Sequence, residues 1–114
     1  MLTYHGVPRE EYDPRASSYL PAAYSQDGFI HTTRLLSRVA DVANKHYGSD
    51  PRPYLLLTID LERVGVPWRY DAPGDDYPHI YGALDRAAVI DVRPMPRAAD
   101  GTFLPLNPEA LPDD

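Results

Sequence analysis

The sequence predicts a small mixed α+β domain with one main helix and with strands in the majority. The length of 114 residues corresponds to about one domain. Only residues 34–46 repeat apolar side chains at helical spacing over several turns. The 13 prolines divide the remaining chain into short elements joined by rigid turns. We expect a single domain over residues 1–106 and a flexible tail over residues 107–114, which are rich in proline and acid.

The composition excludes several classes of protein. No apolar run approaches the roughly 18 residues that a membrane helix needs. A net charge of -6 argues against general nucleic-acid binding, because such binders need a basic face. The absence of cysteine excludes disulfides, thiolate metal sites and cysteine nucleophiles. The first residues do not resemble a signal peptide, so we expect a cytoplasmic protein with a small-molecule partner and an open oligomeric state.

Four short elements are expected before the main helix. Residues 2–5 form a first strand. Residues 8–12 form a helical turn, since the proline at its start fits the first turn of a helix. Residues 16–26 are polar, small and rich in tyrosine, which predicts an irregular loop that can serve as a pocket wall. Residues 28–32 form a second short strand.

The main helix is predicted to run from Arg34 to His46. Thr32 or Thr33 can cap its start with a side-chain oxygen. Gly48 ends it, because glycine tolerates the backbone conformation that commonly follows a helix. One face of this helix carries His46 and the apolar residues that we expect in the core: Leu35, Val39, Val42 and Ala43.

The second half of the chain is predicted to consist of strands and turns. Residues 54–60 (YLLLTID) form an almost continuous apolar run, typical of a central strand buried on both faces. Residues 68–71 and 87–93 are further candidate strands. Asp100-Gly101 predicts a hairpin turn, after which residues 102–104 pair back.

Four histidines are the main candidates for chemistry, because the sequence lacks the common phosphate-loop, dinucleotide, zinc-protease and serine-hydrolase motifs. His46 lies at the helix end, where a histidine interacts favourably with the helix dipole. His5, His31 and His79 each lie at the end of a short strand, next to glycine or threonine. Matching contexts predict one shared site for these three. A three-histidine metal site is an alternative that the spacing does not separate from a ligand pocket.

Several sequence blocks, in this order, resemble the DUF952 family. They are YHGVP, GFIHTT followed by a helix, YLLLTID, and YPHIYGAL followed by AAVIDVRP. The resemblance covers about residues 2–95, and the GFIH and PHIYG blocks are its specific parts. The fold of this family is similar to that of ADP-ribosyltransferases, which cleave NAD at nicotinamide. The resemblance therefore implies a split β-sheet core of ADP-ribosyltransferase type, and NAD as the cofactor.

The same resemblance implies roles for the residues of the cofactor pocket. In ADP-ribosyltransferases a histidine and a glycine often end the first strand, and His5 and Gly6 look like that pair. The histidine would bind a ribose hydroxyl and the glycine backbone would hold the nicotinamide amide. His31 or Thr33 would lie near the ligand, just before the main helix. Tyr81, or its neighbour Tyr77, would stack on a flat ring.

Three histidines are implied as catalytic residues: His5, His31 and His79. His79 looks like the residue that stands at the place of the catalytic glutamate in ADP-ribosyltransferases. A neutral histidine does not supply the negative charge of glutamate, although it can accept a proton or contact a phosphate. The RNA 2'-phosphotransferases, on the same fold, use histidines and arginines with NAD. Four arginines could hold such a phosphate here: Arg9, Arg15, Arg34 and Arg69. Two acids could replace the glutamate: Asp75 and Asp76.

Two functions from different classes follow from these observations. The first is a transferase-type enzyme, ADP-ribosyltransferase-like or NAD-dependent phosphotransferase-like, with an NAD-like nucleotide pocket lined by the three histidines. The second is a non-catalytic protein that binds a small metabolite, or assists another enzyme, on the same fold. The histidine at the place of the glutamate favours the second, because a shared fold does not establish shared chemistry.

Overall fold

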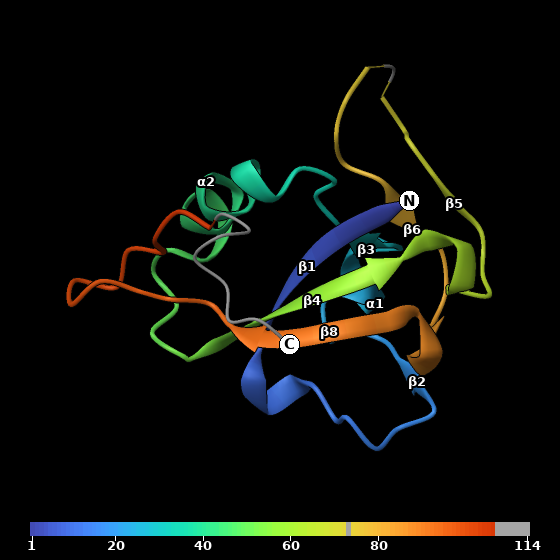
Figure 1. Cartoon of the computed structure of the whole chain (residues 1–114), viewed down its shortest axis with the longest axis horizontal. Coiled ribbons are helices and arrows are strands. Elements are labelled where there is room, and N and C mark those ends of the chain that lie inside the picture. Colours follow the sequence, from blue (N-terminus) through green and yellow to red (C-terminus); the bar gives the residue numbers. More distant parts are fainter. Residues whose placement is uncertain (73, 107–114) are drawn as a thin grey trace.

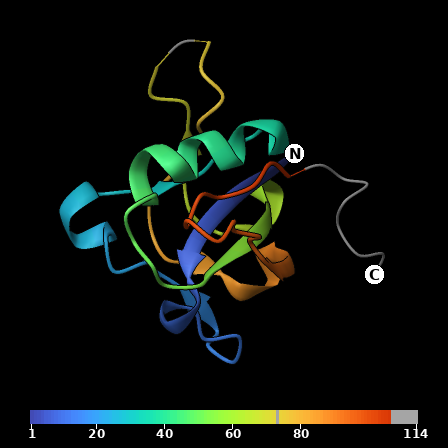
Figure 2. The same cartoon turned by 90° about the vertical axis from the view of Figure 1, so that its left-hand side faces the viewer.

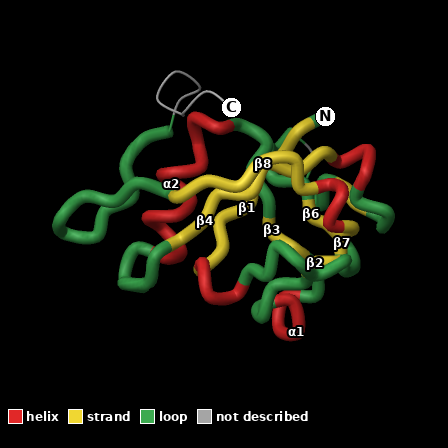
Figure 3. The backbone as a smooth tube through the Cα atoms, turned by 60° about the horizontal axis from the view of Figure 1, so that its bottom comes forward, coloured by secondary structure: helices red, strands yellow, loops and turns green. Residues whose placement is uncertain are grey.

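A three-stranded antiparallel sheet forms the centre of the protein in a computed structural model that describes residues 1–72 and 74–106. Its strands are β1 (Leu2–Pro8), β4 (Tyr54–Asp60) and β8 (Val89–Pro94), with β4 in the middle (Figures 1 and 3). The register places His5 opposite Leu57, and Leu57 opposite Val92. The predicted central strand is therefore confirmed, and the first strand extends three residues beyond its predicted end.

Short strands form two further antiparallel groups. β6 (His79–Ile80) lies between β3 (Ile30–His31) and β5 (Trp68–Arg69). β2 (Ser18–Tyr19) pairs with β7 (Leu84–Asp85). Together with one main helix, these antiparallel sheets confirm the predicted small mixed α+β class.

The helices are one long helix and several single turns. α2 (Leu36–Tyr47) lies across β1, as Figure 2 shows. α1 (Tyr24–Asp27) is a single turn. Three 3-10 turns complete the set: η1 (Arg9–Glu11), η2 (Leu61–Arg63) and η3 (Arg86–Ala88). None of the helices in the described part of the chain has the length and hydrophobicity that crossing a membrane requires.

The burial of β4 on both faces explains its apolar run. Leu55, Leu57 and Ile59 belong to a core shared with β3, β6 and β7. Tyr54 and Leu56 alternate with them and belong to a second core beneath α2. Both faces of one strand are thus covered, so polar residues are confined to its last positions.

The predicted cap of the main helix is wrong. The helix begins at Leu36, and its N-cap residue Leu35 makes no side-chain capping bond. Thr32 instead uses its hydroxyl to donate to the carbonyl oxygen of Pro78 at 2.6 Å, and it accepts a bond from Thr3 at 2.7 Å. The threonine is buried, so it satisfies buried polar atoms of two other segments rather than the helix start.

Other boundaries also differ from the predictions. The expected irregular loop over residues 16–26 is wrong, because it contains β2 and α1 and buries Tyr19 opposite Leu84. The strand predicted over residues 87–93 begins only at Val89, because η3 precedes it. The predicted turn at Asp100-Gly101 is confirmed: Arg97 bridges to Phe103, and Gly101 has a φ of 94°. The predicted tail, residues 107–114, lies outside the described residues.

Asn44 on α2 fixes the segment that follows β8. Its side-chain amide donates to the carbonyl oxygen of Phe103 at 3.0 Å and accepts from the Phe103 amide at 2.7 Å. Phe103 is buried, so loss of both bonds leaves backbone groups without partners. We expect Asn44→Ala to lower the free energy of unfolding by roughly 2 kcal/mol. Urea unfolding would measure this, with Asp41→Ala on the exposed side of α2 as the control. Equal losses in both variants would contradict the prediction.

Candidate functional site

Two adjoining cavities form one cleft beside α2. Their volumes are about 630 and 370 Å³. Both are lined by His5, Ala23, Asp27, His31 and Tyr47, so they adjoin at these residues. We call the whole space the histidine cleft, because His46 and His79 also line its larger part. The chain therefore brings His5, His31 and His79 together, as the sequence predicts.

His5 is buried and is held at both ring nitrogens. Its Nδ1 lies 2.6 Å from the carbonyl oxygen of His31, which can only accept, so Nδ1 carries the proton and donates. Its Nε2 lies 2.8 Å from the hydroxyl of Tyr19, which therefore donates to it. Burial lowers the pKa of His5 from 6.5 to about 4, so the ring is neutral near pH 7. His5 thus ties β1 to β2 and β3, and neither nitrogen is left for a ribose hydroxyl.

His31 and His79 form a cross-strand pair at the mouth of the cleft. They are opposite one another in the pairing of β3 with β6, and their ring centroids are 5.7 Å apart. His31 Nε2 lies 3.0 Å from Asp27 Oδ2, and His79 Nδ1 lies 2.6 Å from Asp71 Oδ2. An ionised carboxylate can only accept, so these nitrogens carry protons. Nδ1 of His31 and Nε2 of His79 have no hydrogen-bond partner within the described part of the chain.

Asp71, which lines neither cavity, holds His79 in place. It accepts hydrogen bonds from the Tyr81 hydroxyl, from Arg69 Nε at 2.7 Å and from His79. These hydrogen bonds, of which that from Tyr81 has the largest effect, hold the pKa of Asp71 well below its usual range. The Arg69 guanidinium also lies over the ring of Tyr81, 4.4 Å from its centroid. Phe29 stacks on the ring of His79, with the two ring centroids 3.8 Å apart.

Tyr81 lies in this network and lines neither cavity, whereas Tyr77, the other candidate for stacking on a ligand, lines the larger one. Gly6 and Thr33 both line the larger cavity. A Cβ on Gly6 would lie 3.3 Å from the sulfur of Met95, so the glycine lets Met95 pack closely against β1 where both residues line the larger cavity. The backbone of Thr33 forms two hydrogen bonds of 2.8 Å with Tyr4, which fixes it to β1.

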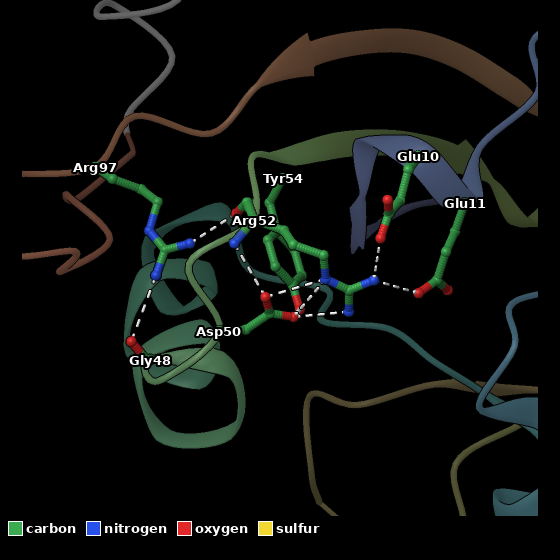
Figure 4. Close-up of polar contacts among 7 residues, drawn as sticks. All are labelled: Glu10, Glu11, Gly48, Asp50, Arg52, Tyr54 and Arg97. Carbon is green, nitrogen blue, oxygen red and sulfur yellow. Dashed lines mark hydrogen bonds and ion pairs between the residues drawn. The ribbon is translucent and has the colours of Figure 1, made fainter.

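Arg52 lies at the smaller end of the cleft. Its guanidinium donates to Glu10 at 2.6 Å, to Asp50 at 2.7 Å and to Glu11 at 3.2 Å (Figure 4). Tyr54 also donates to Asp50, at 2.8 Å. The hydrogen bonds from Arg52, followed by that from Tyr54, hold the pKa of Asp50 well below its usual range. Three carboxylates therefore surround one guanidinium.

Several expectations about charged residues are corrected by the geometry. None of the arginines considered as phosphate ligands lines the described cleft: Arg9, Arg15, Arg34 and Arg69. Of the acids considered as replacements for the glutamate, Asp75 lines the larger cavity and Asp76 lines neither, and His79 is bonded to Asp71 instead. Within residues 1–72 and 74–106, no three histidine or acidic side chains are placed to hold a metal ion. This arrangement gives no support to the three-histidine metal site.

The groups that hold the histidines are not predicted by the sequence. Asp27 and Asp71 carry no motif that separates them from other acids, and Tyr19 lies in a segment expected to be a loop. The spacing of Asp71 and His79 becomes informative only when the pairing of β5 with β6 is known. Lys45 and Tyr47, at the helix end, also line the cleft. For these two, the helical spacing from Val42 and Ala43 was an available signal.

Comparison with known proteins places the chain among related sequences and structures. Residues 7–92 match the family described as "Protein of unknown function (DUF952)". The crystal structure of protein CC0527 from Caulobacter crescentus is similar, with a TM-score of 0.73, 25% identity and coverage of 91% of this chain and 94% of that chain. Its solution NMR structure gives a TM-score of 0.67, 26% identity and 90% coverage of both chains. No curated protein matches.

The buried His5 makes stability depend on pH. In the unfolded chain this histidine takes up a proton near its ordinary pKa of 6.5, whereas in the folded protein it stays neutral down to about pH 4. The unfolded state therefore binds more protons in this window, and stability falls as the pH decreases from 6.5 to 4. The full contribution, present above pH 6.5, is roughly 3 kcal/mol. Urea unfolding at a series of pH values would measure it.

The variant His5→Asn separates the pH dependence of stability that is due to His5 from that due to aspartate and glutamate. Asparagine can still donate to the carbonyl oxygen of His31 but does not titrate in this range. We expect it to be less stable at pH 7 and to lose most of the extra slope between pH 6.5 and 4. The matched control is His46→Asn, which removes an exposed histidine. Parallel pH profiles for His5→Asn and the parent protein would show that His5 does not carry the effect.

Proposed function

The chain belongs to the DUF952 family, and we propose that it binds a small molecule in the histidine cleft and that His31 and His79 transfer protons to and from that molecule. The observation that carries this proposal is the orientation of the two rings. Each ring is held by a carboxylate through one nitrogen, and the other nitrogen has no partner in the described chain. Carboxylate-held imidazoles of this kind act as general acids and bases in many enzymes.

The separation of the two rings suits a paired role. With ring centroids 5.7 Å apart, one histidine can accept a proton from a ligand while the other donates one to a neighbouring atom. The carboxylates hold different nitrogens, Nδ1 of His79 and Nε2 of His31, so the nitrogens left for a ligand are Nε2 of His79 and Nδ1 of His31. The stacking of Phe29 on His79 limits rotation of that ring. A ligand between the two rings would meet groups whose orientation is already fixed, which reduces the cost of reaching a reactive geometry.

NAD is the first ligand that we propose to test. The support is the resemblance of the His5-Gly6 and Gly28 to Thr33 blocks to ADP-ribosyltransferase motifs, and the presence of Gly6 and Thr33 on the cleft wall. We also propose an ADP-ribosyltransferase-like fold, supported by the division of the strands into separate sheets around the cleft. The enzymatic alternatives are transfer of ADP-ribose and NAD-dependent transfer of a phosphate. The occupied nitrogens of His5 give that residue a positioning role rather than a catalytic one.

A non-catalytic binding function is the second candidate. What favours it is that His79, whose ring is held by Asp71, looks like the residue at the place of the catalytic glutamate. Such a protein would use the same cleft to hold a metabolite without converting it. The two candidates differ in turnover: the enzyme converts its bound ligand, and the binding protein does not.

Calorimetric titration with NAD tests the enzyme proposal. We expect saturable binding, with affinity at least about tenfold weaker in His31→Ala and His79→Ala, because each loses a hydrogen bond to the ligand. Arg38→Ala, an exposed change on α2, is the control for handling and folding. Product analysis by mass spectrometry after incubation separates the candidates. Binding without turnover would favour the non-catalytic function, and binding that neither histidine variant weakens would contradict the proposed site.

The tautomer of His79 can be tested without a ligand. We expect Nδ1 of His79 to carry the proton in the parent protein, because it donates to Asp71. In Asp71→Asn the amide can donate in turn, so the form protonated at Nε2 becomes populated. Imidazole ¹⁵N shifts measured by NMR distinguish the two forms. Asp41→Asn, with the same change of charge on α2, serves as the control. A parent protein that carries the His79 proton on Nε2 would overturn this assignment.

A further inference from the structure

We infer that the histidine cleft selects a ligand group that is uncharged or cationic and disfavours a phosphate, which argues against the phosphate-transfer alternative. This inference rests on the proposed binding function of the cleft and names the chemical class that it takes. It starts from the balance of charged side chains on the walls. Two cations, Lys45 and Arg52, line the cleft, against the carboxylates of Glu11, Asp27, Asp50 and Asp75.

Arg52 does not offset this imbalance for a ligand. Its guanidinium already donates to Asp50, Glu10 and Glu11 (Figure 4). A phosphate would have to displace these carboxylates, and it would then be repelled by them at close range. Phosphate sites instead present arginine donors that are free to form paired bonds with the ligand oxygens. Arg52 therefore stabilises the wall of the cleft and does not offer a free guanidinium to an anionic ligand.

The neighbouring arginines are also committed. Arg34 is paired with Asp76 at 2.9 Å, and Arg69 with Asp71 at 2.7 Å. Neither lines the cleft. Among the lining residues that the structure describes, Lys45 is the one cation without a carboxylate in ion-pairing distance. A single exposed lysine is a weak site for a phosphate group, because its charge is well hydrated.

The interior of the cleft adds apolar surface but no positive charge. Val39, Ala43 and Met95 line its floor together with the bare backbone of Gly6. His5 lines both cavities and is neutral near pH 7. The carboxylate of Asp27 lies at the junction of both cavities, beside His31. A neutral or cationic ring fits these surroundings, and a dinucleotide would have to keep its diphosphate outside.

Charged nitroxide probes test the inference without a known ligand. Three probes of one ring system, bearing an amine, an amide or a carboxylate, would be added to the full chain at pH 8. Paramagnetic broadening of the NMR signals of Ala23 and Val42 reports each probe in the cleft. The exposed side chains of Ile90 and Val92, which do not line the cleft, report the general surface. The measured quantity is the ratio of the broadening by the cationic probe to that by the anionic probe. We expect this ratio to be about five for the cleft signals and smaller for the signals of β8.

A charge-matched pair of variants makes the result specific. Asp27→Asn should lower the ratio in the cleft about twofold, whereas Asp41→Asn, with the same charge change outside the cleft, should leave it unchanged. A ratio in the cleft equal to or below that on β8 would overturn the inference. Failure of the proposed function is distinct: it would appear as NAD or metabolite binding that ignores His31 and His79, with the probe ratio intact.

Discussion

The burial of β4 on both faces is the constraint on which the rest of the structure depends. Its alternate side chains enter two separate cores, one shared with the short strands and one beneath α2. Since both cores are anchored on one strand, the two halves of the domain cannot move apart without exposing Leu56 or Leu57. β1 lies against β4 along its whole length, so residues near its middle are fixed relative to both cores. His5 and Gly6 occupy that position.

His5 uses this fixed position to connect three strands. Its two ring nitrogens join β1 to the carbonyl of His31 on β3 and to the hydroxyl of Tyr19 on β2. The cost of burying the ring is offset because both nitrogens are hydrogen-bonded. The backbone of His31 is therefore held from inside, while its side chain turns outward to Asp27. The same residue thus contributes its carbonyl to the fold and its imidazole to the cleft.

The sequence predicts the elements better than it predicts the site. The run of apolar residues at 54–60 and the amphipathic pattern of α2 are local properties, so both are confirmed near their predicted positions. The convergence of His5, His31 and His79 also follows from matching local contexts. Their partners do not, because Asp27, Asp71 and Tyr19 are selected by the pairing of short strands, which local propensity does not determine. Even Thr32, a sound candidate for a helix cap, is recruited by a tertiary bond to Pro78.

The different environments of the three histidines argue for a division of roles among them. A buried ring with both nitrogens occupied cannot exchange a proton with a ligand without breaking the contacts that hold β1 to β2 and β3. A ring held at one nitrogen by a carboxylate keeps the other nitrogen for chemistry, and His31 and His79 both meet this condition. The carboxylate that orients His31, Asp27, also lines the cleft and adds negative charge there, which disfavours anionic ligands at the same place. Orientation of His31 and discrimination by charge therefore share one residue.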